Sequence, residues 1–287
     1  MMAHPLFDPI AALQSLGYTE REASFLYLVA IHSGYFVRRQ FDYFTNRNKG
    51  ALVTRFLKKA RLAGHIEYFD YRQGWHVYHL FSRAIYRLLG DVESQNRRRK
   101  GDAQVRVHLM ALDYVLENEG DHFLESDADR MRFFAENRRI EPRLFIGGDG
   151  NLLPLLASFP FSIADRTRPA QSLARVVFID EGLLTIERFL RFLMTAAPLL
   201  RALDTFEVVY VSTSDVNFRA AKDAFWSRFS VNVPSNLRLF DDGLRSVGRL
   251  PGAVSQARFT TLLLGYSYPK LRRSETRGST EGSHAER

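Results

Sequence analysis

The side chains with the clearest chemistry are cations and amides clustered between residues 46 and 58, with one more cation further on. Arginine can bind guanine through two parallel hydrogen bonds, and lysine can neutralise a phosphate. Asparagine and threonine can bond to base edges or to the sugar–phosphate backbone. Such a set is typical of a surface that binds a polyanion. The candidate residues are Asn46, Arg47, Asn48, Lys49, Thr54, Arg55, Lys58 and Arg72.

Carboxylates near two expected strands form a second candidate set. Asp180 and Glu181 end one strand, and Glu207 begins the next. Carboxylates can hold Mg²⁺ or Mn²⁺ for phosphodiester hydrolysis. However, the strand that carries Glu207 lacks the lysine of restriction-type metal nucleases, and Asp180 can equally cap the helix that follows. We therefore expect no catalytic residue, metal or cofactor, and keep a nuclease as an alternative only.

Other patterns that could do chemistry are incomplete. His76 and His79 are three residues apart on an expected strand, so they point to opposite faces and do not form a metal site with His65. The glycines at 147–150 lack the Gly-Lys-Ser/Thr of a P-loop, and residues 265–269 lack the last glycine of a nucleophile elbow. The chain has no cysteine, which excludes disulfides and thiolate chemistry.

The net charge of the chain is confined to its N-terminal third. Residues 1–100 carry 16 Lys/Arg and 8 Asp/Glu, whereas the other 187 residues carry 24 of each, so the whole +8 falls in the first 100. A basic module joined to a neutral one indicates a nucleic-acid-binding head on a scaffold.

Capping signals and apolar periodicity divide the basic part into short elements. Asp8-Pro9 starts one helix, and Thr19 with Glu22 forms a capping box that starts the next. Apolar residues between 52 and 60 recur on one face, which predicts a helix whose opposite face carries Arg55 and Lys58. The expected elements are helices over 9–16, 20–33, 36–44, 49–63 and 82–90, and a β-hairpin over 65–81 that turns at 72–74.

The order helix, helix, basic helix, hairpin over residues 15–82 resembles the winged helix-turn-helix superfamily. The chain is also loosely similar to replication-relaxation-type proteins of bacterial mobile elements, which have an N-terminal winged helix and an α/β tail. The resemblance implies that the 49–63 helix enters the major groove and that Arg72 lies near the minor groove. We expect the aromatic residues Tyr68, Trp75 and Tyr78 to pack within the domain instead.

The rest of the chain predicts an α/β domain over 102–271, after a basic linker at 91–101. Strand and helix patterns alternate, which favours a small, mostly parallel sheet. The overall fold class is thus α/β, with a winged helix at residues 1–90 in front. The expected strands are 143–147, 175–180 and 206–212, and the expected helices begin at 102, 126, 183 and 216. The polar tail 272–287 should be disordered.

These features favour a cytoplasmic, sequence-specific binder of double-stranded DNA that regulates transcription, and the looser similarity implies that it does so in a mobile element. There is no signal-peptide pattern and no apolar run long enough to span a bilayer. We expect the neutral part to dimerise the protein or to sense a signal, and a homodimer would form through this part or through the helix that starts at Asp102. Two alternatives are a relaxation accessory or nuclease-like enzyme acting on DNA, and an adaptor whose winged helix binds protein.

Overall fold

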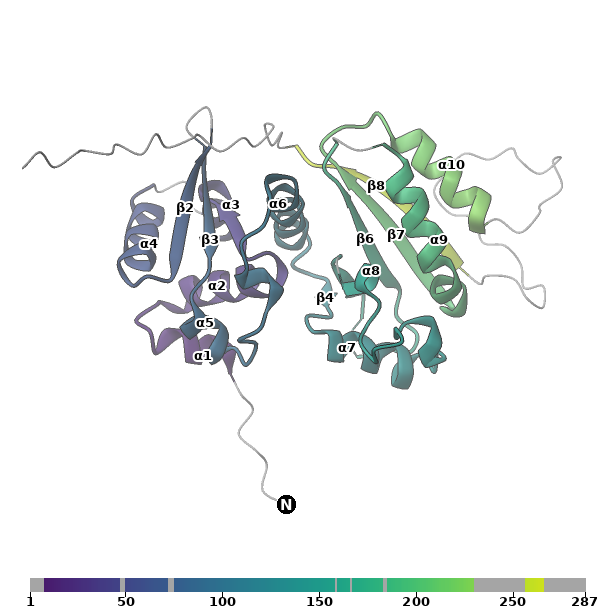
Figure 1. Ribbon diagram of the computed structural model, residues 1–287, viewed down its shortest axis with the longest axis horizontal. Coiled ribbons are helices and arrows are strands. Elements are labelled where there is room, and N and C mark those ends of the chain that lie inside the picture. Colours follow the sequence, from purple (N-terminus) through teal and green to yellow (C-terminus); the bar gives the residue numbers. More distant parts are fainter. Residues whose placement is uncertain are drawn as a thin grey trace, which may run out of the picture.

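A computed structural model describes residues 8–46, 50–71, 75–157, 159–165, 167–182, 185–229 and 256–265 (Figure 1). The α/β class is confirmed, with a small antiparallel sheet in the N-terminal part and a larger mixed sheet in the C-terminal part. Among the described residues, no helix has both the length and the apolar character needed to cross a bilayer. The hairpin tip at 72–74 and the tail 272–287 lie outside the described residues.

The N-terminal module contains the helices and the hairpin that the sequence predicted. The Thr19–Glu22 capping box starts the second helix, and Asp8 caps the first. A short strand before the third helix was not predicted, and it pairs antiparallel with the second hairpin strand, so the sheet order is β1-β3-β2. The elements are α1 (Pro9–Gln14), α2 (Glu20–His32), β1 (Tyr35–Val37), α3 (Arg38–Phe44), α4 (Gly50–Leu62), β2 (Ile66–Tyr71), β3 (Trp75–Leu80) and α5 (Arg83–Leu88).

Four phenylalanines form the centre of this module. The ring of Phe56 stacks on that of Phe41 at 4.3 Å and meets Phe25 and Phe36 at about 6 Å. These residues come from all three larger helices and from β1, so their contact fixes α4 against α2 and α3. The core face of α4 is therefore the one that its periodicity predicted.

The segment 91–101, expected as a linker, packs on the N-terminal module. A 3₁₀ turn (Gln95–Arg97) lies against α2, where the Asn96 side chain donates to the carbonyls of Ala30 and Ile31 at 3.0 and 2.8 Å. Gly34 has a positive φ of 75°, and a Cβ there would lie 2.0 Å from the Asn96 carbonyl oxygen. Only glycine allows this close approach of the two backbones.

Helix α6 (Asp102–Glu117) lies between the two parts of the molecule (Figure 1). Leu112 and Leu116 belong to the core of the N-terminal module, whereas Leu109 and Met110 belong to the core of the C-terminal part. On the N-terminal side, α6 contacts α2, α3 and β1. The predicted helix is thus confirmed, but its apolar sides are covered within one chain, so it is not an exposed dimerisation helix.

The C-terminal sheet has the order β4-β5-β6-β7-β8. The three long strands β6, β7 and β8 are parallel, and the short β4 and β5 add to them antiparallel. Aromatic residues of α9 and α10 pack on Phe178 and Phe206, and α6 covers the other face near β6. The elements are β4 (His122–Phe123), α7 (Asp127–Arg132), α8 (Pro154–Ala157), β5 (Phe161–Ile163), β6 (Ala174–Asp180), α9 (Glu187–Ala202), β7 (Thr205–Ser212), α10 (Phe218–Phe229) and β8 (Gln256–Leu263).

One expected strand is wrong. Residues 143–147 do not join the sheet: a 3₁₀ turn (Pro142–Leu144) begins there, and Ile146 makes only an isolated bridge with Leu152. Pro142 has a fixed φ and no amide hydrogen, so it starts the turn where the sequence pattern suggested a strand. The predicted strands at 175–180 and 206–212 are confirmed as β6 and β7.

Candidate nucleic-acid interface

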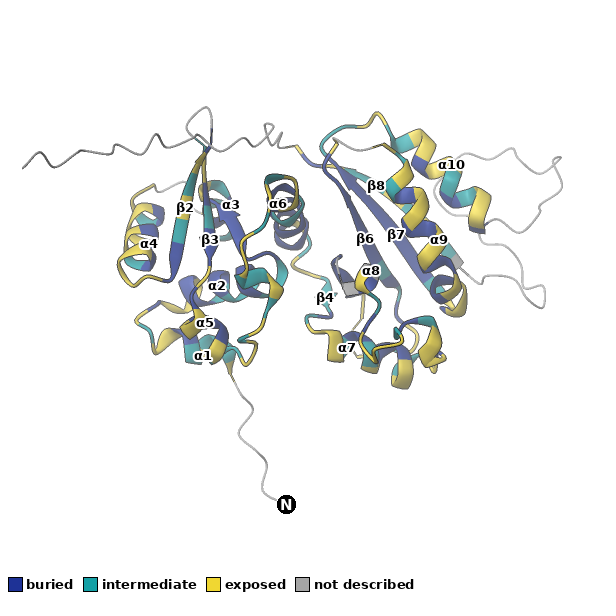
Figure 2. Cartoon of the chain, viewed as in Figure 1, coloured by how far each residue is buried: buried dark blue, intermediate teal, exposed yellow. Residues whose placement is uncertain are grey.

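The outer face of α4 is built from a strip of exposed residues opposite the core (Figure 2). Val53, Phe56 and Ala60 are buried, so residues half a turn away point to solvent. The centre of the exposed strip is formed by Ala51, Arg55, Lys58 and Leu62, and Leu62 is 79% exposed. Arg55 and Lys58 make no hydrogen bond or ion pair with the part of the chain that the structure describes, so both charges are available to a ligand.

The other cations of α4 are used within the fold. Lys59 donates to the Glu22 carboxylate at 2.5 Å and to the Gly17 carbonyl at 3.1 Å, which ties α4 to α2. The Arg61 guanidinium lies 4.3 Å from the centre of the Tyr68 ring, which connects α4 to the hairpin. Tyr68 is 39% exposed, so this ring packs less completely than the sequence suggested.

Arg38 extends the candidate surface, and sequence reasoning missed it. Its guanidinium donates to the Gly50 carbonyl at 3.0 Å and lies 3.4 Å from the Thr54 hydroxyl, at the first turn of α4. Half of the Arg38 side chain is exposed. The adjacent Arg38 and Arg39 at the start of α3 indicated that a cation could lie here. The sequence could not show which of the two arginines faces outward.

Arg39 points inward instead. It donates two hydrogen bonds to Asp113 of α6 at 2.8 and 2.7 Å, and Gln40 donates a third at 2.8 Å. Asp113 is buried, with 3% of its surface exposed. This polar contact fixes α3 on α6. Of the two adjacent arginines, Arg38 therefore belongs to the exposed surface and Arg39 to the buried contact between α3 and α6.

The remaining candidate residues of this surface surround the start of α4. Thr54 is exposed, and its hydroxyl donates to the Gly50 carbonyl at 2.8 Å. Asn46 is exposed at the end of α3 with a positive φ of 48°, a conformation that asparagine tolerates better than most residues. Arg47, Asn48, Lys49 and Arg72 lie outside the described residues, so their expected contacts stay predictions.

The basic run at 97–100 contacts the module itself. Arg97 donates to the Val92 carbonyl at 3.0 Å, and Arg98 lies 3.7 Å from Glu93. Arg99 donates to both carboxylate oxygens of Glu67. These three cations therefore contribute less to an outward positive field than their number in the sequence suggests.

The acidic candidates do not come together. Glu207 pairs with Arg175 in register, whereas Asp180 pairs with Ser212 at the other end of β6, five residues or about 16 Å away. The alternation of side chains also puts Glu207 and Asp180 on opposite faces of the sheet. Within the described ranges, no three His, Asp or Glu side chains gather as a metal site would need.

Each of these carboxylates already has protein partners. Asp180 accepts hydrogen bonds from the Tyr210 hydroxyl and from the Gly182 amide at 3.1 Å, and Glu181 pairs with Arg188 at 2.9 Å. The alternative capping role of Asp180 is not observed, because Ile186 precedes the first residue of α9. The geometry therefore gives Asp180 a structural role in the turn after β6.

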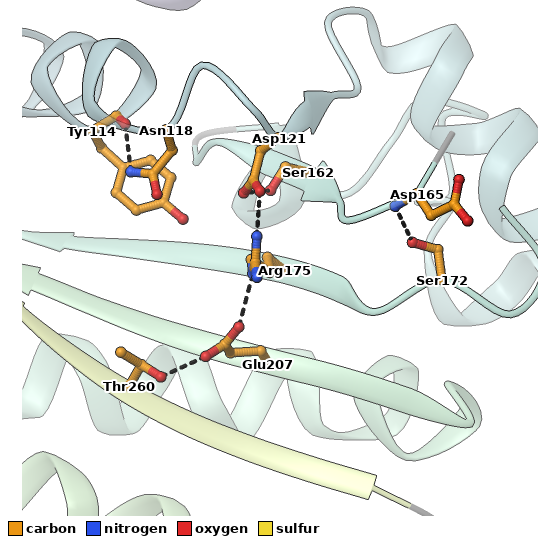
Figure 3. A network of polar contacts seen from close by, with 9 residues as sticks. All are labelled: Tyr114, Asn118, Asp121, Ser162, Asp165, Ser172, Arg175, Glu207 and Thr260. Carbon is orange, nitrogen blue, oxygen red and sulfur yellow. Dashed lines mark hydrogen bonds and ion pairs between the residues drawn. The ribbon is translucent and has the colours of Figure 1, made fainter. Parts of the chain in front are cut away.

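Glu207 belongs to a polar ladder across the sheet (Figure 3). Arg175 of β6 donates to Glu207 at 2.8 Å and to Asp121, and Thr260 of β8 donates to the other oxygen of Glu207. Ser162 of β5 donates to Asp121 at 2.9 Å. Both carboxylates of this ladder are bonded to Arg175 and to a hydroxyl, so the ladder holds strands together and its carboxylates already have protein partners.

Comparisons with family models, with curated proteins and with solved structures gave no match for this chain.

Proposed function

We propose that residues 9–88 form a winged helix-turn-helix domain that binds double-stranded DNA, with α4 as the recognition helix. The helices α2, α3 and α4 followed by the β2-β3 hairpin have the order helix, helix, basic helix, hairpin on which the resemblance rests, and this supports the proposal. The observation that carries the proposal is the exposed strip of α4, where Arg55 and Lys58 are unpaired within the described chain while Lys59 and Arg61 are used internally.

The chemistry of the strip fits the major groove. A helix with a small residue at its exposed centre can approach base edges closely, and Ala51 supplies such a residue beside Arg55. Arg55 has the planar donor pair that guanine accepts, and Lys58 and Arg38 can hold phosphates on either side. The biological role that we propose is the regulation of transcription in the cytoplasm, on a bacterial mobile element.

Binding as a homodimer would let two copies of α4 read a two-fold symmetric site. Since α6 is covered within the chain, the dimer would form through the outer surface of the C-terminal part. Leu190 and Met194 lie one turn apart on α9 and are 39% and 64% exposed. Sedimentation of the wild type and of Met194→Lys at micromolar concentration tests this, and a wild type that is monomeric with and without DNA would count against it.

Selection of bound sequences from random DNA, followed by affinity measurement on the selected site, tests the DNA-binding proposal. The Arg55→Ala, Lys58→Ala double variant should lose about tenfold or more in affinity, because it removes one base contact and one phosphate contact. The matched control is Arg83→Ala, Arg87→Ala, which removes the same charge from the exposed face of α5 in the same module. Equal losses in both double variants, or no selected sequence, would contradict a recognition role for α4.

A nuclease is not proposed as a second function. Glu207 lies at the other end of the strands from Asp180 and Glu181, and the three carboxylates are bonded to Arg175, Tyr210 and Arg188 respectively.

A further inference from the structure

A pocket of about 450 Å³ lies where the N-terminal module, α6 and the C-terminal part meet. Ile31 and Asn96 line it from the N-terminal module, His108 from α6, and Arg130 and Phe159 from the C-terminal part. This volume is within the range of pockets that hold small organic ligands. The pocket is separate from the exposed strip of α4 that the proposed DNA contact uses.

The described lining residues carry more positive than negative charge. Lys100, Arg130 and Arg188 line the pocket, whereas Glu181 is the one carboxylate among the described lining residues and pairs with Arg188 at 2.9 Å. The two lining histidines add no charge at neutral pH. Burial and the Arg130 charge lower the pKa of His32 to about 3, and burial and Lys100 lower that of His108 to about 3.

Arg130 is the best-placed group for binding an anion. It is 7% exposed, and its Nε and one terminal nitrogen donate to the carbonyls of Leu124 and Leu156 at 3.1 and 2.6 Å. These bonds fix the plane of the guanidinium. Its other terminal nitrogen has no hydrogen-bond partner in the described part of the chain, so it can donate to a carboxylate or phosphate oxygen.

His32 provides a second polar group that lacks a partner. Its Nε2 is shielded from solvent and makes no hydrogen bond with the described residues. The rest of the lining includes the apolar side chains of Ile31, Val107, Phe159 and Pro160. The pocket thus combines an oriented cation with an apolar wall, as expected for a ligand with an anionic head and an apolar body.

We propose that this pocket binds a small organic anion, namely a carboxylate or phosphate ester with an aromatic or aliphatic body, held by the Arg130 guanidinium. The proposal does not rest on DNA binding by α4. Since parts of both modules line the pocket, a bound ligand would contact both at once.

Calorimetric titration of the full chain with benzoate, phenyl phosphate and benzyl alcohol tests the proposal. The two anions should bind saturably below about 10 mM, and the neutral alcohol, which has a similar body, should not. Benzoate and phenyl phosphate together distinguish a carboxylate site from a phosphate site. Absence of saturable binding by either anion, or equal binding by the alcohol, would overturn the proposal.

Variants at Gln104 test whether binding occurs in this pocket without disturbing buried groups. Gln104 lines the pocket but is exposed on α6, so its substitution should leave the fold intact. Gln104→Glu should weaken binding of the anion roughly fivefold, and Gln104→Lys should strengthen it by a similar factor. Arg132→Gln, an exposed charge change on α7 outside the pocket, is the control and should have no effect. Anion binding that the two Gln104 variants leave unchanged, or shift in the same direction, would place the site elsewhere.

Discussion

The two parts of this chain use arginine in different ways. In the C-terminal part, Arg175 donates to carboxylates on both sides of its strand, and Arg188 pairs with Glu181. In the N-terminal module, Arg55 and Lys58 stand exposed on α4 without partners in the described chain. Part of the excess charge of the N-terminal module therefore reaches solvent on α4, whereas the Arg175 contacts of the C-terminal part cross-link a sheet.

This comparison shows that the number of cations in a segment is a poor measure of what they can bind. Arg97, Arg98 and Arg99 form the densest basic run of the chain, yet all three contact their own module. Arg55 and Lys58, which make no hydrogen bond or ion pair with the described residues, are more available to a phosphate than these three.

The largest expected change in stability comes from Phe56, on the buried face of α4, and its neighbour Arg55 on the exposed face provides the comparison. Phe56→Ala should lower the free energy of unfolding by about 3–5 kcal/mol, because it leaves a cavity among three other phenylalanines. Arg55→Ala should change it by less than about 0.5 kcal/mol. Urea denaturation followed by circular dichroism measures both. If Arg55→Ala destabilised the fold as much as Phe56→Ala, the assignment of the two faces of α4 would be wrong.

The next largest change in stability is expected at the contact between α3 and Asp113 of α6. Asp113→Ala should cost about 3 kcal/mol, because it removes a buried carboxylate and leaves Arg39 and Gln40 without that acceptor. Glu119→Ala, an exposed acid just beyond the same helix, is the control and should be near neutral. Equilibrium unfolding compares them. Equal stability of the two variants would mean that α6 is not fixed to the N-terminal module through Asp113.

A somewhat smaller change in stability is expected from pH, through His32 on α2 and His108 on α6. The folded pKa values of His32 and His108 are about 3, below the unfolded value near 6.5, so between these values the unfolded chain binds more protons. Stability should therefore fall as the pH drops below 6.5, by about 2 kcal/mol per ring at pH 5. Urea titrations at pH 7 and pH 5 should show a smaller loss in His32→Asn and in His108→Asn. The same loss in these variants as in the wild type would show that neither ring is kept neutral by the fold.

Much of the fold followed from local sequence signals. The capping box at Thr19, the apolar stripe around Phe56 and the valine-rich runs of β6 and β7 each specify an element through neighbouring residues. Pairings over long distances did not follow. The inward turn of Arg39 depends on Asp113, 74 residues away, and the sequence around Arg39 does not differ from that of a solvated basic helix.

The candidate sites follow the same rule. The exposure of Arg55 and Lys58 was predictable, because helical periodicity alone fixes the face on which they lie. The sequence already placed Asp180 at the end of one strand and Glu207 at the start of the next, and the parallel register of β6 and β7 puts these positions at opposite ends of the strands. The pocket around Arg130 requires three segments to meet, so no local pattern indicated it.

The salt dependence of DNA binding gives the smallest and most selective test of the comparison between the two parts. Each phosphate that a cation neutralises adds about 0.9 to the slope of log affinity against log salt concentration. Lys58→Ala should therefore reduce that slope by about one on the selected DNA site. Arg143→Ala removes the same charge from the C-terminal part, where Arg143 is exposed but paired with Glu141 at 2.8 Å, and should leave the slope unchanged. Fluorescence anisotropy at several salt concentrations measures both slopes. Equal reductions of the slope would mean that binding depends on the net charge of the whole molecule. Whether a cation is exposed without a partner, as Lys58 is, or paired, as Arg143 is, would then make no difference to DNA binding.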